Sequence, residues 1–421
     1  MNKLTKYAFA NLYAMASGIS TTKEQAGHGS PFVSFSTVFN NYFLPDTLPD
    51  LMDTSLKEQE TYSIKKGDIL VTRTSETIDE LAMSCVAVKD YPCATYSGFT
   101  KRLRPLTTGI AYDKYLAFYL RGYLFRKAVT NNAFMTLRAS FNEDIFSFLN
   151  LYLPDYQEQV KIGDMLYNME QKIQLNKQIC AELEAMAKTI YDYWFVQFDF
   201  PDENGRPYRT SGGEMVWNEQ LQREIPKGWD VKHLQDICRF RNGINYEKDC
   251  LGDYTYRIAN VRNITVSSFL MDVSDFDEIT LPKNQGDKYI LSENDIIIAR
   301  SGTPGATRLV IKPSNNVIFC GFIICCTPLN SQCRLFLSYF LKQLEGTNAT
   351  KTGGSILQNV SQDTLKSLQV TLPNDSVLNR FNQKIEPLVQ MMQNIINENR
   401  ELAKLRDCLL PMLMNGQARV E

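Results

Sequence analysis

The chain has 421 residues, of which 44% are hydrophobic and 22% charged, and its formal net charge is −2 at pH 7. These values are typical of a soluble protein with two or three domains, and they exclude a generally basic nucleic-acid coat protein. No apolar run approaches the ~18–20 residues of a membrane helix. The N-terminal stretch carries no clear signal-peptide cleavage site, so we expect a cytoplasmic protein with no membrane partner.

Residues 1–153 form the first predicted globular block, and residues 226–372 repeat its plan. "GDILVTRTS" in the first block matches "NDIIIARSG" in the second, with Asp68 and Asp295 and also Arg73 and Arg300 separated by the same offset (295 − 68 = 300 − 73 = 227). Further phrases match in the same order, among them "ASGIS" with "RNGIN", "SGFTKRLRPL" with "CGFIICCTPL" and "YLAFYLRG" with "FLSYFLKQ". Such internal similarity predicts two domains of one mixed α+β fold.

A long helix is predicted after each block, over residues 154–198 and 373–415. Apolar residues recur in alternating steps of four and three, which is the spacing of a coiled-coil seam. The first seam is Ile162, Leu166, Met169, Ile173, Asn176, Cys180, Leu183, Ala187, Ile190 and Trp194. The second is Phe381, Ile385, Leu388, Met392, Ile395, Asn399, Leu402, Arg406, Leu409 and Leu413, with Leu405 expected to share the place of Arg406.

Each helix is about three times the ~12-residue mean length, which favours a mutual coiled coil over packing on its own block alone. One asparagine in each seam is a device that fixes register. Two like blocks followed by like helices predict a pseudo-two-fold arrangement, with the helices antiparallel and the blocks at opposite ends. Residues 199–225 are rich in Gly, Pro and charge and are predicted to be a linker, and residues 416–421 a tail.

The sequence contains none of the common catalytic motifs: it has no P-loop, G-x-G-x-x-G, G-x-S-x-G or H-E-x-x-H pattern. The chain has two histidines, and its ten cysteines show no paired metal spacing. We therefore predict no catalytic residue, no metal and no cofactor on this chain, which makes it a binding protein or a subunit whose partners carry the chemistry.

Guanidinium and hydroxyl groups directly after the two matched strands can bond phosphate oxygens or base edges. With nearby basic and glycine-rich segments, they define the candidate DNA-binding residues. These are Arg73, Thr74, Ser75, Lys101, Arg102, Arg104, Arg138, Ser140, Arg300, Ser301, Thr303, Arg308, Lys351, Thr352, Gly353 and Ser355. Two structural alternatives stay open: Asp68 with Arg73 and Asp295 with Arg300 brace turns, and "TKRLR" (100–104) is a solvated face.

The plan resembles the specificity (S) subunit of type I restriction-modification systems. The resemblance covers essentially the whole chain. It rests on the two strand phrases, on "LPDYQEQVKIGDML" entering the first helix, on the segment from "DFPDENGRPYRTSGG" to "IPKGW", and on "LRDCLLPMLMNGQ" near the end. The first block has no counterpart of "IPKGW", so we expect its edge to differ.

This resemblance implies two target-recognition domains that read the halves of a split, asymmetric site on double-stranded DNA. Two helices between them would form an antiparallel coiled coil that spaces the half-sites and docks partners. Two modification subunits would supply S-adenosylmethionine-dependent adenine methylation, and two restriction subunits would add ATP- and Mg-dependent translocation and cleavage. The S subunit itself is non-catalytic.

Two other hypotheses remain at this stage. A scaffold protein with duplicated interaction domains and no DNA contact would agree with the near-neutral charge. A self-sufficient methyltransferase or nuclease is disfavoured by the missing motifs. Salt-dependent DNA binding separates the first alternative from a DNA-specificity subunit, because phosphate neutralisation makes affinity fall with salt.

Overall fold

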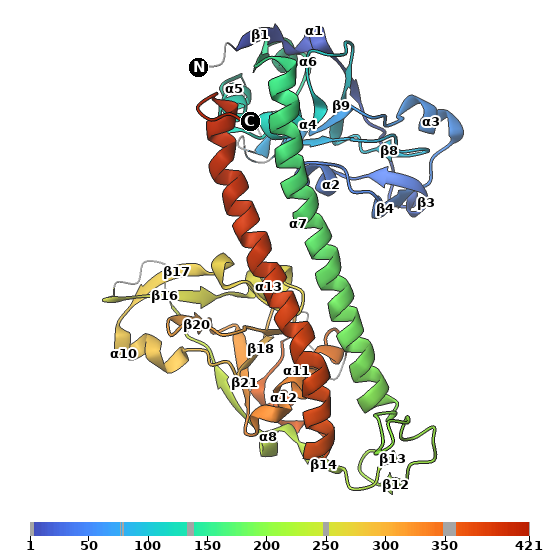
Figure 1. Cartoon of the computed structure of the whole chain (residues 1–421), viewed down its shortest axis with the longest axis vertical. Helices are drawn as coiled ribbons and strands as arrows, with labels where there is room; N and C mark the ends of the chain where they lie inside the picture. Colours follow the sequence, from blue (N-terminus) through green and yellow to red (C-terminus); the bar gives the residue numbers. More distant parts are fainter. Residues whose placement is uncertain are drawn as a thin grey trace. The chain divides into compact units, whose positions relative to one another are not determined.

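The computed structural model describes residues 4–75, 77, 80–132, 139–246, 252–347 and 359–420. The chain divides into two compact units. Unit 1 comprises residues 1–174 and 401–421, and unit 2 comprises residues 175–400. Each globular block predicted from the sequence falls within one unit, and both long helices contribute residues to both units (Figure 1).

Unit 1 is built on a four-stranded sheet of order β2-β9-β5-β7, a three-stranded sheet β4-β3-β8 and the antiparallel pair β1-β11. Its strands are β1 (Thr5–Ala8), β2 (Tyr13–Ser17), β3 (Ala26–Val33), β4 (Asp50–Met52), β5 (Ile69–Thr72), β6 (Thr74–Ser75), β7 (Ser84–Val86), β8 (Thr95–Tyr96), β9 (Thr100–Pro105), β10 (Ala139–Ser140) and β11 (Asn150–Leu153). Its short helices are α1 (Phe9–Leu12), α2 (Phe35–Asn40), α3 (Leu56–Thr61), α4 (Asp113–Tyr119), α5 (Tyr123–Asn132) and α6 (Glu143–Phe148).

Unit 2 has the matching sheets β15-β21-β18-β19, β17-β16-β20 and β14-β22, together with the hairpin β12-β13. Its strands are β12 (Met215–Asn218), β13 (Arg223–Pro226), β14 (Asp230–His233), β15 (Cys238–Asn242), β16 (Tyr254–Ala259), β17 (Asp277–Leu281), β18 (Ile296–Ala299), β19 (Thr307–Leu309), β20 (Val317–Phe319), β21 (Ile323–Pro328) and β22 (Gln369–Leu372). Its short helices are α8 (Leu234–Ile237), α9 (Val261–Val266), α10 (Lys283–Gly286), α11 (Arg334–Gln343) and α12 (Gln362–Ser367), with 3₁₀ turns η3 (Val273–Asp275), η4 (Asp287–Tyr289) and η5 (Ser331–Cys333).

The two four-stranded sheets confirm the internal repeat strand by strand. In both, the strand that follows the Gly-Asp or Asn-Asp turn lies second from the edge and is buried along its whole length (β5 and β18). A strand covered on both faces needs β-branched and aliphatic residues throughout, which explains the uninterrupted "ILVT" and "IIIA". The same pairing recurs at the edge, where β1 pairs with β11 as β14 pairs with β22.

The backbone pairing at the edge of the first block is therefore the same as in the second, and the expected difference is one of side-chain packing. Thr5 to Ala8 form the edge strand although no "IPKGW" precedes them, because the pairing uses backbone groups that any sequence supplies. The lost packing partner is Trp229, which in unit 2 is buried beside Phe195, Phe198 and Phe200.

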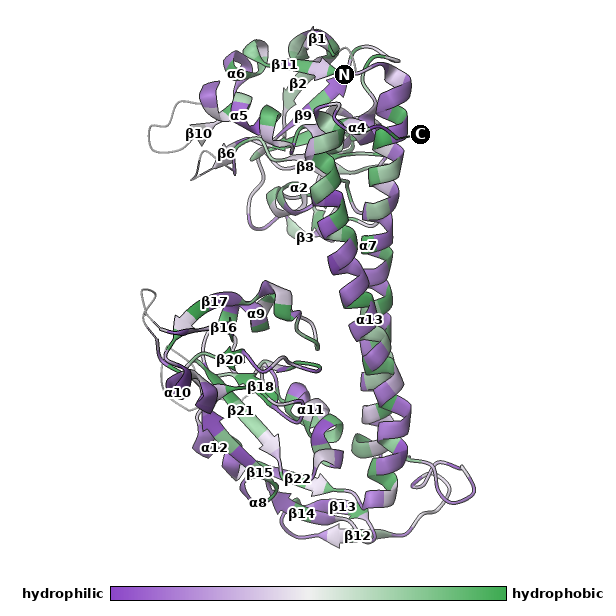
Figure 2. Ribbon diagram, turned by 60° about the vertical axis from the view of Figure 1, so that its left-hand side comes forward, coloured by the Kyte–Doolittle hydropathy of each residue, from purple (hydrophilic) through white to green (hydrophobic). Residues whose placement is uncertain are grey.

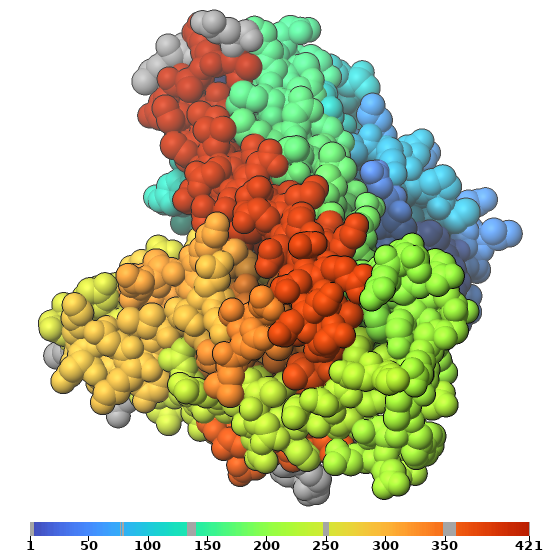
Figure 3. Space-filling model, turned by 60° about the horizontal axis from the view of Figure 1, so that its bottom comes forward, coloured from blue at the N-terminus to red at the C-terminus, as the bar shows by residue number. Residues whose placement is uncertain are grey.

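The predicted linker is also more than a connection. Phe200 is buried in the core of unit 2, and the hairpin β12-β13 adds Ile225 to it. Arg380 of the second long helix donates a hydrogen bond to the carbonyl oxygen of Asp202 at 3.3 Å. Figure 3 shows the segment packed along that helix within unit 2.

The long helices are α7 (Tyr156–Tyr191), continued by the π-turn η2 (Asp192–Val196), and α13 (Asp375–Met414). Apolar and polar residues alternate along both, as Figure 2 shows. In unit 2 the helices pair antiparallel: Asn176 contacts Asn399, Cys180 contacts the carbonyl of Met392, and Tyr191 packs on Phe381. In unit 1 the pairing is also antiparallel, since Glu170 contacts Arg406 and Lys161 contacts Val420.

The two seam asparagines contact each other. Asn176 is 1% exposed and donates to the side-chain oxygen of Asn399 at 2.8 Å and to Glu398 at 2.7 Å. A buried amide with two acceptors favours one register, because any shift of the helices would leave it unsatisfied.

One expectation for the seam was wrong. Leu405 does not share the place of Arg406, since it is 47% exposed. Arg406 itself fills the seam, bonded to the nearly buried Glu170 at 2.7 Å and lying 5.0 Å from the ring centre of Tyr42. The aliphatic stem and the paired charge let an arginine occupy this place. Among the described residues, no helix is long and apolar enough to cross a membrane.

Candidate nucleic-acid interface

A buried aspartate braces the turn before the matched strand in each unit. Asp68 is 0% and Asp295 3% exposed. Asp68 accepts from the backbone N–H of Lys65, and Asp295 from that of Ser292, in both cases at 2.8 Å. The structural alternative for the two aspartates is thereby confirmed, because their carboxylates face the interior.

The arginine that neutralises this aspartate comes from different strands in the two units. Arg104 on β9 bonds both carboxylate oxygens of Asp68 and the carbonyl of Ser63. In unit 2 the position of Arg104 is Thr327, which bonds Asp295, while Arg241 on β15 supplies the guanidinium. The hydrogen bond to Asp68 raises the pKa of Arg104.

Arg241 also takes over the contacts of Arg102. Arg102 donates to Ser63 and lies 5.5 Å from the ring centre of Tyr96, whereas Arg241 donates to Ile290 and lies 5.1 Å from that of Phe319. One arginine in unit 2 therefore performs the structural work of two in unit 1.

Four predicted DNA-binding cations are thus engaged inside their own domains, which corrects the expectation for them. Lys101, Arg102 and Arg308 are 5%, 9% and 6% exposed. Lys101 pairs with Glu143 and holds the pKa of that carboxyl below its usual range. Arg308 pairs with Glu345 and donates to the carbonyl of Ser267. Arg104 is committed to Asp68, so the segment "TKRLR" is neither a solvated face nor a free basic patch.

Arg73 and Arg300 differ from these cations because both are exposed. Each stands just beyond its strand, held by two backbone hydrogen bonds that are the same in both units. The backbone N–H of Arg73 donates to the carbonyl oxygen of Phe99 at 2.8 Å, and the carbonyl oxygen of Arg73 accepts from the backbone N–H of Phe141 at 2.7 Å. The backbone N–H of Arg300 donates to the carbonyl oxygen of Phe322 at 2.8 Å, and the carbonyl oxygen of Arg300 accepts from the backbone N–H of Val360 at 2.9 Å.

The phenylalanines sit in tight turns at the start of β9 and β21. In unit 1 the turn is closed by a hydrogen bond from the N–H of Thr100 to the carbonyl oxygen of Ser97, at 2.9 Å. In unit 2 the N–H of Ile323 donates in the same way to the carbonyl oxygen of Cys320, also at 2.9 Å. The preceding glycine of each turn donates to an isoleucine carbonyl at 2.7 Å, Gly98 to Ile19 and Gly321 to Ile244.

Steric crowding explains why glycine precedes isoleucine in the duplicated "GI" segment of both units. A Cβ on Gly18 would lie 2.1 Å from the carbonyl oxygen of Ser97, and one on Gly243 would lie 2.1 Å from that of Cys320. No side chain fits such a gap, so glycine is required for the two backbones to approach. Three of the repeated sequence segments therefore contact one another in each unit: the Gly-Ile segment, the segment that runs from the buried aspartate to the exposed arginine, and the Gly-Phe turn.

Phe99 and Phe322 are 63% and 61% exposed at this place. We call Arg73 with Phe99 in unit 1, and Arg300 with Phe322 in unit 2, the Arg–Phe edges. Sequence reasoning missed the phenylalanines although "SGF" and "CGF" were already matched. The repeated letter was the available signal, but a phenylalanine in a strand-rich segment is more often buried.

The remaining predicted contacts surround these edges unevenly. Ser140 is exposed and pairs through β10 with Thr74 of β6. Ser75 is buried and accepts from the N–H of Thr77. Ser301 and Thr303 are half-buried, and Thr303 contacts Thr265. The predicted contacts outside the described residues are Arg138, Lys351, Thr352, Gly353 and Ser355.

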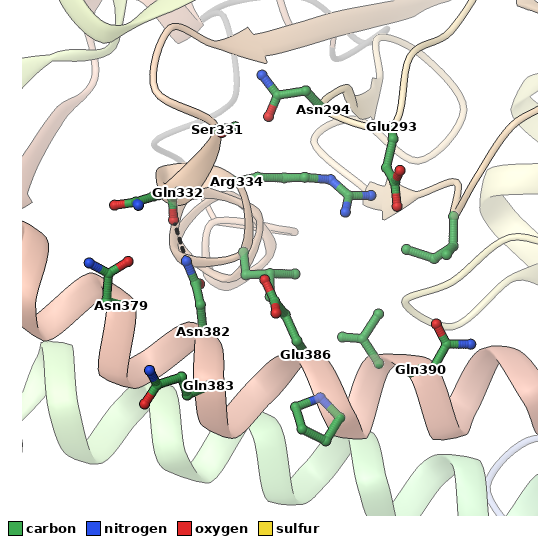
Figure 4. Close-up of a pocket in the computed structure, with 14 residues that line it drawn as sticks. Glu293, Asn294, Ser331, Gln332, Arg334, Asn379, Asn382, Gln383, Glu386 and Gln390 are labelled. Carbon is green, nitrogen blue, oxygen red and sulfur yellow. Dashed lines mark hydrogen bonds between the residues drawn. The ribbon is translucent and has the colours of Figure 1, made fainter.

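A pocket lies in unit 2, between α13, η5 and the turn before β18 (Figure 4). Its volume is about 870 Å³, and amide side chains with Glu293 and Glu386 line it. Arg334 reaches toward Glu293 in Figure 4, and burial lowers its pKa. Asn382 donates to the carbonyl of Gln332 at 2.8 Å. This lining contains no nucleophile positioned by a base, and within the described residues no group of three His, Cys, Asp or Glu could hold a metal.

Comparison with known proteins accounts for this arrangement. The model of the type I restriction modification DNA specificity domain matches twice, over residues 15–185 and 226–406. The chain belongs to this family. The first match contains the Arg–Phe edge of unit 1, and the second contains that of unit 2.

Relatives in this family cover nearly the whole chain. The type I restriction enzyme MjaIX specificity subunit of Methanocaldococcus jannaschii is 25% identical over 384 residues, which is 88% of this chain and 82% of the relative. The HindI specificity subunit of Haemophilus influenzae is 24% identical over 450 residues, 92% and 94% of the two chains. The crystal structure of the S subunit of a type I restriction-modification system from M. genitalium shares the fold, with a TM-score of 0.57 at 15% identity over 98% of this chain and 96% of that chain.

Proposed function

We propose that this chain is the non-catalytic DNA-specificity subunit of a type I restriction-modification complex and that it reads a bipartite, asymmetric target. The observation that carries the proposal is the pair of Arg–Phe edges on identical backbone frames in two copies of the specificity domain. Two equivalent surfaces on one chain suit a target with two half-sites, and sequence differences around the edges let the half-sites differ.

The edges favour DNA over a purely protein partner for a physical reason. An exposed guanidinium held by its backbone can neutralise a phosphate, and the hydroxyls of Ser140 and Thr303 beside it add hydrogen-bonding groups for the DNA backbone or base edges. Of the predicted basic contacts that the structure describes, Lys101, Arg102 and Arg308 are buried, whereas Arg73 and Arg300 are exposed.

Methylation and cleavage then belong to partner subunits. We propose two modification subunits that bind S-adenosylmethionine and methylate adenine, and two restriction subunits that use ATP and Mg. The polar pocket beside α13 supports a docking role for this helix, because its amides and carboxylates suit a polar segment of a partner protein. The paired helices α7 and α13 would set the length of the unread spacer. A cytoplasmic location agrees with these partners.

DNA binding by the chain, assembled with its modification subunit, tests the proposal. Binding to a labelled duplex should weaken steeply between 50 and 200 mM salt, because each neutralised phosphate releases counterions. Affinity that is absent at every salt concentration, in a complex shown to be assembled, would support the scaffold alternative.

A further inference from the structure

The two phenylalanines of the Arg–Phe edges form a feature that sequence reading of DNA does not explain. Phe99 and Phe322 are the same residue, at the same turn position and with nearly the same exposure. Leaving a large aromatic mostly in water forgoes stabilisation that its burial would give. The fold forgoes it twice, at equivalent places.

Residues around the phenylalanines differ between the two units. Thr74 follows the arginine in unit 1 and Ser301 in unit 2, while Ser20 and Asn245, in the segments after β2 and β15, approach the two turn glycines. At the start of the next helix, Glu143 in unit 1 is matched by Gln362, which bonds Asn242. These groups carry donors and acceptors that change from unit to unit, as reading two different half-sites requires.

A phenyl ring has neither donor nor acceptor, so it cannot read a base pair by hydrogen bonding. It can pack against sugars or wedge at a base step, and such contacts are largely independent of sequence. The turn fixes the backbone at each phenylalanine before binding, through the glycine N–H bond on one side and the arginine N–H bond on the other. Little backbone entropy is therefore lost when the ring meets DNA.

We propose that Phe99 and Phe322 are paired, sequence-independent DNA contacts: each ring wedges at a base step of its half-site while the adjacent arginine neutralises a phosphate. The inference rests on the proposed function and adds a division of labour to it. The rings supply affinity for any DNA, and the variable polar neighbours supply the choice of bases.

The test uses the chain assembled with its modification subunits, with fluorescein-labelled duplexes of its methylated target and of a scrambled sequence. Phe99→Ala and Phe322→Ala should each weaken binding to both duplexes by roughly tenfold, which corresponds to about 1.4 kcal/mol, and the target-to-scrambled ratio should not change. The methylated motif should also stay the same. 2-Aminopurine placed along each half-site should report an unstacked step that the alanine variant abolishes.

Leu106→Ala and Leu329→Ala are matched controls. These leucines are also exposed in both units, at 60% and 56%, but they lie beyond the opposite ends of β9 and β21 from the Arg–Phe edges. The controls should bind both duplexes like the unmodified complex. Circular dichroism and thermal unfolding verify that all four variants fold.

Three results would overturn the inference. Unchanged affinity in both phenylalanine variants would show that the rings do not touch DNA. A loss confined to the target duplex would make them specificity contacts. Failure of the variants to retain the modification subunit would assign the rings to a protein interface. Absence of DNA binding by the unmodified complex is a separate outcome, and it would contradict the proposed function itself.

Discussion

Arg104 of unit 1 and Arg241 of unit 2 make the same ion pair from different strands. Each bonds the buried aspartate of its turn at 2.6 Å, and each donates to the carbonyl that lies five residues before that aspartate. The domain therefore requires a guanidinium at this point in space, and either strand can supply it.

Loss of the cation should destabilise the domain strongly. Arg104→Thr leaves Asp68 charged and 0% exposed, and breaking such a pair costs about 3–5 kcal/mol. Because Arg104 is partly exposed, we expect the lower end of this range. Hydrogen exchange of amides in β5 and β9 measures it within unit 1.

The arrangement of unit 2 should rescue this variant. Ala16→Arg combined with Arg102→Cys and Arg104→Thr reproduces the residues at positions 241, 325 and 327. The triple variant should recover most of the lost protection. Protection no higher than in Arg104→Thr alone would show that the two arrangements are not interchangeable.

The helix pair offers a second stability prediction. Asn399→Leu removes one acceptor from the buried amide of Asn176, which should cost about 1–3 kcal/mol. Adding Asn176→Leu should restore stability or exceed it, because the polar pair fixes register at the expense of stability. All three tryptophans, Trp194, Trp217 and Trp229, lie in unit 2, so their fluorescence during urea unfolding reports on this unit. A double variant less stable than the single one would contradict the account.

Thiol chemistry should follow burial. Burial raises the pKa of Cys85 to about 12, whereas Cys93 and Cys408 are exposed. At pH 8 a thiol reagent should label Cys93 and Cys408 quickly and leave Cys85 unlabelled, as mass spectrometry of the digested chain can show. Because the folded-state pKa of Cys85 lies above its unfolded value, its contribution to stability should fall as pH rises from about 9 to 12. Rapid labelling of Cys85 in the folded chain would refute its burial.

The exposed arginines should act through phosphates. Arg73→Ala and Arg300→Ala should each weaken binding of the assembled complex to all duplexes and lower the salt slope by about 1. Arg206→Ala serves as the control, because Arg206 is an exposed arginine in the segment 199–225. Relaxed choice at one base pair, with an unchanged salt slope, would instead make the arginine a base reader.

The repeat, the long helices and the seam asparagines could all be predicted, because each leaves a periodic or duplicated signal in the sequence. The roles of Lys101, Arg102 and Arg104 could not, since burial of a basic residue depends on partners such as Asp68 and Glu143 that lie far away in the chain. Arg104 and Arg241 occupy different positions of the sequence repeat, yet their guanidinium groups make equivalent ion pairs in the two units. Phe99 and Phe322 were visible as matching letters, and their exposure needed the structure.

If the paired helices set the distance between the half-sites, longer helices should lengthen the unread spacer without changing the bases that are recognised. Inserting one heptad at matched points of α7 and α13 keeps both seams in phase, so the helix pair should still form. The unread spacer of the methylated motif should lengthen while both half-sites stay the same. Altered half-sites with an unchanged spacer would contradict the ruler role.

Methylome sequencing of cells with and without this gene tests the central claim most directly. The account predicts that one split motif, with a methylated adenine in each half, is present with the gene and disappears without it. Restoring the gene should restore the motif. An unchanged methylome in cells that express the modification partner would contradict the assignment of this chain as the specificity subunit.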